Sequence, residues 1–143
     1  MKRSIWKKSL LIIKNFIRVN KFAADTMAVV LYLEKRKLPN RVKQIFADAK
    51  NGNAEIYIPS MVLVEIAYLC EKKKIETSLE EANKMIDSND SFRFLSMTIE
   101  IIKSTFQITD IRELHDRIIA GSAKNIDAEI ITNDPEIINS KFV

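Results

Sequence analysis

Short apolar runs alternate along the chain with longer stretches in which apolar residues recur at helical spacing. Apolar runs bounded by turn-forming residues predict strands over 20–25, 54–59, 92–97 and 128–133. Helical spacing predicts helices over 26–37, 41–50, 60–72, 79–88, 98–106 and 110–125, with a short helix after residue 134. Strands separated by helices are typical of βα units. We therefore expect an α/β fold of three layers, α/β/α, with a mainly parallel sheet of about four to five short strands.

Local sequence signals indicate where several of these helices begin or end. Gly52, between two asparagines, ends the helix over 41–50, and Ser78 is a typical N-cap for the helix over 79–88. Asp110, with Glu113 three residues on, resembles a capping box and predicts a helix start at Asp110. Asp134 before Pro135 favours the final short helix.

The helix over 60–72 is apolar almost all round, which predicts that it is buried on most sides, together with Cys70. Glu65 is the only charged residue between Ile56 and Leu69. A charge in such surroundings is costly to bury unless it is paired or bound to a cation. Glu65 is thus a candidate functional residue.

The positive charges of the chain are concentrated at its N-terminus. Residues 1–21 contain seven basic residues and no acidic one, whereas residues 22–143 contain sixteen basic and nineteen acidic residues. The net charge of +4 therefore does not indicate a phosphate-binding face on the body of the protein. We interpret residues 1–20 as a basic amphipathic extension and residues 21–143 as one domain.

The role of this extension stays open. It could pack on the domain or on a partner subunit, result from the choice of start site, or contact a membrane surface. Its longest uninterrupted apolar run is LLII, too short for a secretory signal or a membrane span. We expect a cytoplasmic protein without integral membrane association.

Several chemistries are excluded because their residues are missing. His115 is the only histidine and Cys70 the only cysteine, so zinc sites rich in histidine or thiolate are excluded. Two isolated glycines, Gly52 and Gly121, cannot form a P-loop or a dinucleotide-binding turn, and no GxSxG motif is present.

Carboxylates remain as the candidates for chemistry. Asp25 ends the first strand and Asp134 follows the last, which predicts that both lie at the carboxyl edge of the sheet. Glu65 and Asp116 lie on helices, and Asp116 is followed by the small residues 120–123, which permit close packing. Four carboxylates without histidine favour Mg²⁺ or Mn²⁺. Such ions activate water and stabilise both oxygens of an in-line phosphoryl displacement.

Each carboxylate also has a structural interpretation. Asp25 and Asp134 could simply cap helices, and Asp116 could pair with a neighbouring Lys or Arg. Glu65 is the hardest to explain structurally, although it too could pair with a cation. We interpret His115 as a surface or packing residue rather than a ligand.

The order of four short motifs resembles the PIN-domain family, in particular its VapC-like branch. The resemblance covers the chain from about Lys21 to Val143 and rests on FAADT, YIPSMVLVEIAYL, ELHDRIIAGSAK and IITND, each with one of the acidic residues. It implies a Mg²⁺- or Mn²⁺-dependent ribonuclease whose metal-binding cluster is Asp25, Glu65, Asp116 and Asp134. It also implies that Thr26 and Thr132 support these ligands or position water.

The function that we expect from this resemblance is hydrolysis of RNA phosphodiester bonds by the toxin of a type II toxin–antitoxin pair. Its expected partners are the RNA substrate, a cognate antitoxin and a second copy of the chain. Arg112, Arg117 and Lys124 are candidates for contacts with the RNA backbone. The alternatives are an RNA-processing nuclease without an antitoxin and a non-catalytic PIN-like module for binding or assembly.

Overall fold

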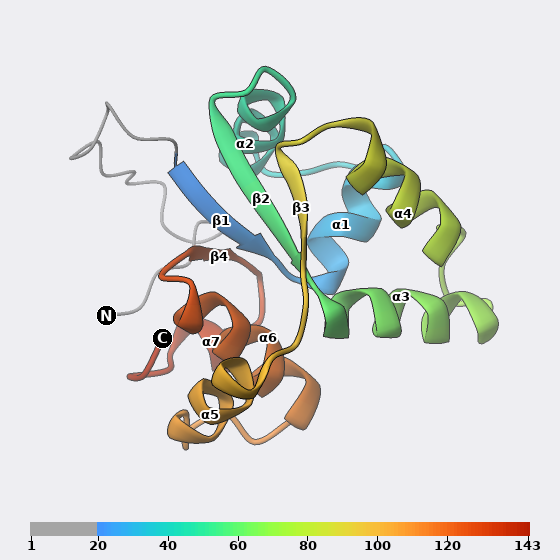
Figure 1. The fold of residues 1–143 in the computed structure, drawn as a ribbon. Coiled ribbons are helices and arrows are strands. Elements are labelled where there is room, and N and C mark those ends of the chain that lie inside the picture. The colour runs from blue at the N-terminus through green and yellow to red at the C-terminus, as the bar shows by residue number, and fades with distance from the viewer. Residues whose placement is uncertain (1–19) are drawn as a thin grey trace.

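The computed structural model describes residues 20–143, and the predicted amphipathic helix of the N-terminal extension lies outside the described residues. Figure 1 shows the four strands and seven helices of the described part. In chain order they are β1 (Asn20–Ala24), α1 (Thr26–Leu33), α2 (Asn40–Lys50), β2 (Ala54–Pro59), α3 (Ser60–Glu71), α4 (Leu79–Ser88), β3 (Phe92–Leu95), α5 (Ile99–Gln107), α6 (Leu114–Asn125), β4 (Glu129–Ile131) and α7 (Pro135–Ile138). None of these helices combines the length and the apolar character that a membrane crossing requires.

The four strands form one parallel sheet in the order β3-β2-β1-β4. β1 is central, and its Ala23 pairs with Tyr57 of β2 on one side and with Ile130 of β4 on the other. Since all strands are parallel, their carboxyl ends meet at one edge of the sheet. The residues that follow β1 and β4 therefore lie beside each other.

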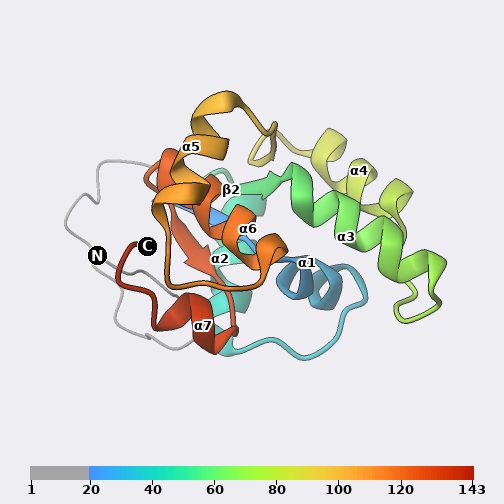
Figure 2. The same cartoon turned by 90° about the horizontal axis from the view of Figure 1, so that it is seen from below.

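Helices cover both faces of the sheet, as the alternation of side chains along β1 requires. Phe22 and Ala24 point into one core, which α1, α2, α3 and α4 complete, and Ala23 points into the other, to which α6 and α7 contribute. Figures 1 and 2 show α5, α6 and α7 gathered at the end of the molecule toward which the strands run. The predicted three-layer α/β/α fold with a parallel sheet is confirmed.

Two predicted helix boundaries are wrong because side chains near these boundaries form hydrogen bonds with segments that are distant in the sequence. α1 ends at Leu33 rather than at residue 37, and the Glu34 carboxylate accepts hydrogen bonds from the backbone amides of Glu76 and Thr77. α6 begins at Leu114, capped by Glu113, and not at Asp110. The Asp110 carboxylate instead accepts hydrogen bonds from Ser140 Oγ and the Lys141 amide, which fixes the C-terminal segment.

The prediction that α3 is buried on most sides is also wrong. Only Val62 and Ile66 of this helix are buried, whereas Val64 is 58% and Tyr68 56% exposed, and Cys70 is half-buried. The helix packs one narrow face on the rest of the domain. The remaining apolar side chains are thus available to line a cavity or to contact another molecule.

α6 is anchored by a very close crossing with α5. A Cβ atom at Gly121 would lie 2.3 Å from Thr105 Oγ1 and 2.6 Å from the Thr105 Cα. The small residues 120–123 are all buried, so they permit the close packing that the sequence predicts. This crossing fixes the position of the helix that carries Asp116.

Candidate functional site

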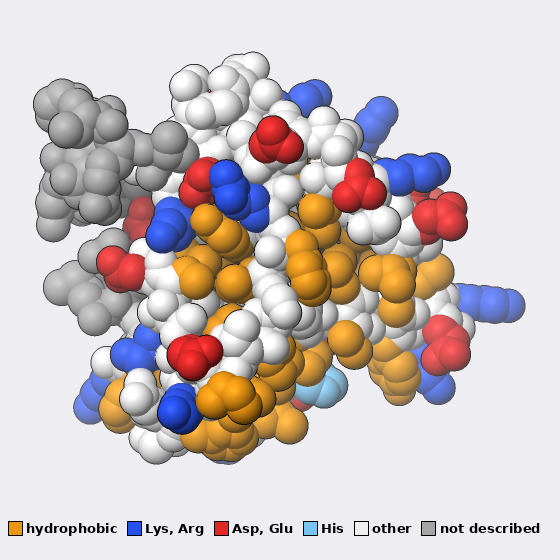
Figure 3. Space-filling model, in the orientation of Figure 1, with side chains coloured by type: hydrophobic (Ala, Val, Ile, Leu, Met, Phe, Trp, Pro, Cys, Tyr) orange, Lys and Arg blue, Asp and Glu red, His pale blue; other side chains and the backbone are white. Residues whose placement is uncertain are grey.

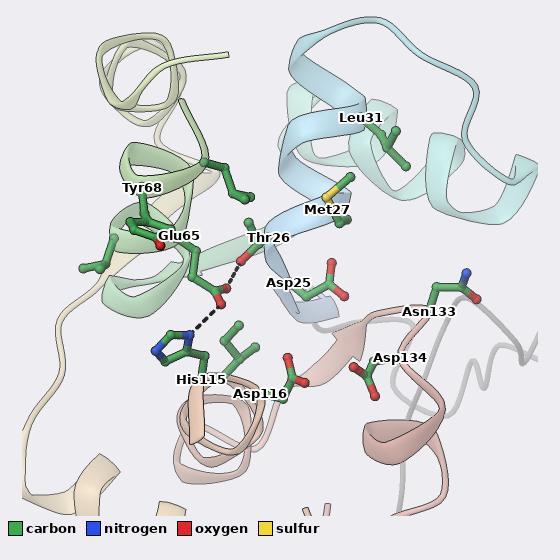
Figure 4. A pocket seen from close by; sticks show the side chains of 13 residues that line it. Asp25, Thr26, Met27, Leu31, Glu65, Tyr68, His115, Asp116, Asn133 and Asp134 are labelled. Carbon is green, nitrogen blue, oxygen red and sulfur yellow. Dashed lines mark hydrogen bonds and ion pairs between the residues drawn. The ribbon is translucent and has the colours of Figure 1, made fainter. Parts of the chain in front are cut away.

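The four candidate carboxylates line one cavity of about 810 Å³ at the carboxyl edge of the sheet. Asp25 and Asp134 follow β1 and β4, Glu65 comes from α3 and Asp116 from α6, so four separate elements contribute one acidic residue each. Figure 4 shows these four side chains around the cavity. The residues that line it are Asp25, Thr26, Met27, Leu31, Val64, Glu65, Tyr68, Leu69, His115, Asp116, Ile119, Asn133 and Asp134, and none of them is Lys or Arg.

The backbone and two helix caps fix Asp25 and Asp134 beside each other. The Asp25 amide donates to the carbonyl of Ile131 at 3.1 Å, which joins the end of β1 to the end of β4. Asp25 Oδ1 caps α1 by accepting from the Ala28 amide at 2.9 Å, and Asp134 Oδ1 caps α7 in the same way. The structural interpretation of both residues therefore holds, and it does not conflict with a functional one, because each cap places its carboxylate at the cavity.

Thr132 links these two residues directly. Its Oγ1 accepts a hydrogen bond from the Asp134 amide at 3.0 Å, and its side chain is hydrogen-bonded to the Asp25 carboxylate. Because Thr132 is fully buried, this contact is shielded from water. The side chain thus holds the two aspartates in a fixed relation, which is the supporting position that the family resemblance implies.

The surroundings of Asp25 and Asp116 disfavour charge on these two carboxylates. Burial raises the pKa of the half-buried Asp25 from 3.8 to about 6, although hydrogen bonds from Thr132 and Ala28 oppose the rise. Burial and the neighbouring Asp134 carboxylate also raise the pKa of Asp116. Among the described residues, no Lys or Arg forms an ion pair with Asp116. The site is therefore short of positive charge.

Glu65 is held by two hydrogen-bonding side chains rather than by a Lys or Arg. Thr26 Oγ1 donates to Glu65 Oε1, and His115 Nδ1 lies 3.1 Å from Glu65 Oε2, as the dashed lines in Figure 4 show. His115 Nδ1 is also 3.6 Å from Glu113 Oε2. In the part of the chain that the structure describes, no basic residue other than His115 is paired with Glu65. His115, which we interpreted as a surface or packing residue, thus lies in the cavity against a candidate ligand.

The donor set fits a hard divalent cation. Four carboxylates line a cavity without Lys or Arg, and burial, with the neighbouring carboxylates, raises the pKa of Asp25 and Asp116. Within residues 20–143, however, no three acidic, histidine or cysteine side chains are arranged closely enough to chelate an ion. In Figure 4, Glu65 turns toward Thr26 and His115 rather than toward the aspartates. Side-chain rotation would therefore have to accompany binding.

The basic residues that the sequence indicated for RNA contact do not line the cavity. Arg112 pairs with Glu136 at 3.0 Å, Arg117 donates to the carbonyl of Ile111 at 2.7 Å, and Lys124 is exposed elsewhere on α6. Sequence reasoning also missed Tyr68, which lines the cavity with its side chain largely exposed. Its spacing of three residues from Glu65 on the same helix was the signal that could have identified it.

Comparisons with known proteins agree with this fold. No curated protein matches the chain. The fold resembles the crystal structure of VapBC2 from Rickettsia felis bound to a DNA fragment from their promoter, with a TM-score of 0.63, 18% identity, and coverage of 86% of this chain and 95% of that chain. It also resembles DNA-bound VapBC from Salmonella typhimurium, with a TM-score of 0.63, 19% identity, and coverage of 87% and 95%. The model of the PIN domain matches residues 23–142, and the chain therefore belongs to the PIN-domain family.

Proposed function

We propose that this chain is a Mg²⁺- or Mn²⁺-dependent endoribonuclease and the toxin of a type II toxin–antitoxin pair. The observation that carries the proposal is the convergence of Asp25, Glu65, Asp116 and Asp134 on one cavity that no Lys or Arg lines. Helix capping explains the places of Asp25 and Asp134, but Glu65 and Asp116 have no Lys or Arg partner among residues 20–143, which a purely structural role would favour. Membership of the PIN family and the likeness to VapBC structures support the same function.

In this proposal the four carboxylates hold one or two divalent ions. Bound ions would activate water and stabilise the charge that develops on the phosphate during an in-line displacement. The chain itself supplies the arrangement of the carboxylates. Thr132 fixes Asp25 relative to Asp134. Thr26 and His115 hold Glu65 in the absence of an ion, and Glu65 would rotate from them to bind one. The half-buried aspartates strengthen the attraction for a cation, because electrostatic interactions are stronger away from water.

The proposed protein partners are an antitoxin and a second copy of this chain. The likeness to VapBC structures supports the antitoxin. An apolar patch on and near α5, formed by Phe94, Ile99, Ile102 and Phe106, supports the homodimer, since each of these side chains is at least 41% exposed. Figure 3 shows hydrophobic side chains gathered over α5 at the lower edge of the molecule. We refer to these four residues as the α5 patch.

The test compares cleavage of RNA by the full-length protein and by Asp116→Asn. We expect the wild-type protein to cleave total cellular RNA when Mn²⁺ or Mg²⁺ is added and to stop when EDTA is added. Asp116→Asn should lose cleavage at least 100-fold, because the substitution removes a charged ligand without changing the shape of the side chain. Isothermal titration with Mn²⁺ should show weaker binding by the same variant.

The matched control is Asp127→Asn, which changes an exposed aspartate just beyond the C-terminal end of the same helix. Asp127 has a φ of 54°, a conformation that asparagine adopts readily, so this variant should fold and cleave normally. Absence of metal-dependent cleavage in the wild type, or equal loss in both variants, would contradict the proposed function.

A further inference from the structure

The cavity has two chemically different halves, and the carboxylates occupy only one of them. The other half is a wall of apolar side chains contributed by α1 and α3, namely Met27, Leu31, Val64, Tyr68 and Leu69. In Figure 4, Tyr68 and Glu65 come from α3, and Met27 comes from α1 on the other side of the cavity. One or two ions would fill a small part of about 810 Å³, a volume within the range of roughly 300–1,000 Å³ typical of sites that hold whole small molecules.

Tyr68 contributes a planar aromatic ring to this wall. Its side chain is on the same face of α3 as Glu65, one helical turn further on, and is 56% exposed. An aromatic ring in this position adds little to the stability of the fold, because much of it stays in contact with water. Its face can instead stack on another planar group that enters the cavity.

Positive charge lies next to the ring. Lys72 Nζ is 5.5 Å from the centroid of the Tyr68 ring, and Lys72, Lys73 and Lys74 follow one another at the end of α3, all exposed. No ion pair involves these three lysines among residues 20–143. The lining of the cavity therefore passes from the carboxylates to an aromatic ring, and Lys72 lies beside that ring. This order of acidic, aromatic and basic groups complements a nucleotide chain with its bound cation.

Resting on the proposed function, we infer that Tyr68 stacks an unpaired base of the RNA adjacent to the scissile phosphate and that Lys72 contacts a neighbouring phosphate. A base in a helix is already stacked on both faces, so only a base in a single strand or loop can reach the ring. Because every base has an aromatic face, Tyr68 positions the substrate without reading its sequence.

The test measures cleavage of single-stranded oligonucleotides by Tyr68→Leu, with Tyr68→Phe as the conservative variant. Tyr68→Leu should lower kcat/KM between about 5-fold and 150-fold, the range expected for loss of one base–aromatic stack, and Tyr68→Phe should stay within about 2-fold of the wild type. The matched control is Phe142→Leu. Phe142 is 40% exposed and does not line the cavity, so this variant should cleave normally.

An abasic scan of the oligonucleotide separates stacking from a general loss of structure. The wild type should lose activity when the base is removed at one position beside the cleavage site, and Tyr68→Leu should lose nothing further at that position. Additive losses at every position would overturn the inference. So would normal RNA cleavage by Tyr68→Leu together with weaker binding of a protein inhibitor, which would assign the wall to a protein partner.

A binding measurement keeps the inference testable when cleavage itself is absent. An oligonucleotide with 2-aminopurine at the stacking position should lose fluorescence on binding to Asp116→Asn, because stacking quenches this base. The double variant Asp116→Asn/Tyr68→Leu should bind without that quenching. RNA cleavage by the wild type, without quenching when the oligonucleotide binds, would contradict only the role of Tyr68. Quenching without any cleavage by the wild type would contradict the proposed nuclease activity.

Discussion

Replacing Asp25 by asparagine should make the metal-free protein more stable while abolishing its cleavage of RNA. The half-buried carboxylate of Asp25 has a pKa raised to about 6 by burial, with the charges of Asp134 and Glu65 adding to the rise. Asparagine has the same shape and is as good an N-cap as aspartate, so its side-chain oxygen can still accept from the Ala28 amide. The substitution thus removes an unfavourable charge and keeps the hydrogen bond.

The magnitude follows from the difference in pKa between the folded and unfolded states. A folded pKa above the unfolded value of 3.8 means that the ionised carboxylate destabilises the fold. The cost is complete above about pH 6 and disappears below about pH 4. A shift of about 2 units corresponds to about 3 kcal/mol. Asp25→Asn should therefore raise the free energy of unfolding by up to about 3 kcal/mol at pH 8 and by only about 0.5 kcal/mol at pH 4.

Urea unfolding in EDTA at pH 8 and pH 4 measures this difference, with Asp127→Asn as the control for an exposed carboxylate. With a typical urea dependence of about 2 kcal/mol per molar, the midpoint should rise by on the order of 1.5 M at pH 8. Unfolding in the presence of Mn²⁺ should reverse the order, because the ion stabilises only the wild type. A variant that is less stable than the wild type at pH 8, or a gain that is equal at both pH values, would refute the electrostatic reasoning.

Two further predictions concern packing and assembly. Gly121→Ala should lower the free energy of unfolding by about 2–3 kcal/mol in thermal or urea unfolding, because the new Cβ would meet the backbone of Thr105; a gain, as helix propensity alone predicts, would contradict the close crossing of α5 and α6. Ile99→Glu in the α5 patch should convert a dimer to a monomer in sedimentation experiments, whereas Ile99→Leu should not; an unchanged oligomeric state would remove this patch from the dimer interface.

The parts of the fold that the sequence predicts well depend on local patterns. The strands and most helix ends follow from apolar periodicity and capping residues, as at Gly52, Ser78 and Asp134. The errors arise where a side chain is used by a distant segment. Asp110 looks like the start of a helix, but it binds the C-terminal segment through Ser140, 30 residues away. No local pattern contains that information.

The candidate site likewise has parts that the sequence predicts and parts that depend on contacts between distant segments. Asp25 and Asp134 could be placed together from the sequence because both follow strands, and the ends of parallel strands meet at one edge. The surroundings of Glu65 could not be predicted, since Thr26 and His115 are 39 and 50 positions away from it in the chain and reach it only through the packing of α1 and α6 beside α3. The exposure of Tyr68 could not be predicted, because an apolar pattern all round a helix indicates burial and does not show which face contacts the core.

The apolar composition of α3 gains a different meaning once its exposure is known. Apolar side chains of α1 and α3, such as Met27 and Val64, line the cavity beside the carboxylates, and burial raises the pKa of Asp25 and Asp116. Under the proposed function, this apolar wall also offers an RNA base a surface to enter. Because a cation must displace the protons that the raised pKa values retain, metal affinity should fall as the pH drops through 6. Under the proposed function, the binding of a cation by the carboxylates and the stacking of a substrate base on Tyr68 would both depend on the way α3 borders the acidic cluster.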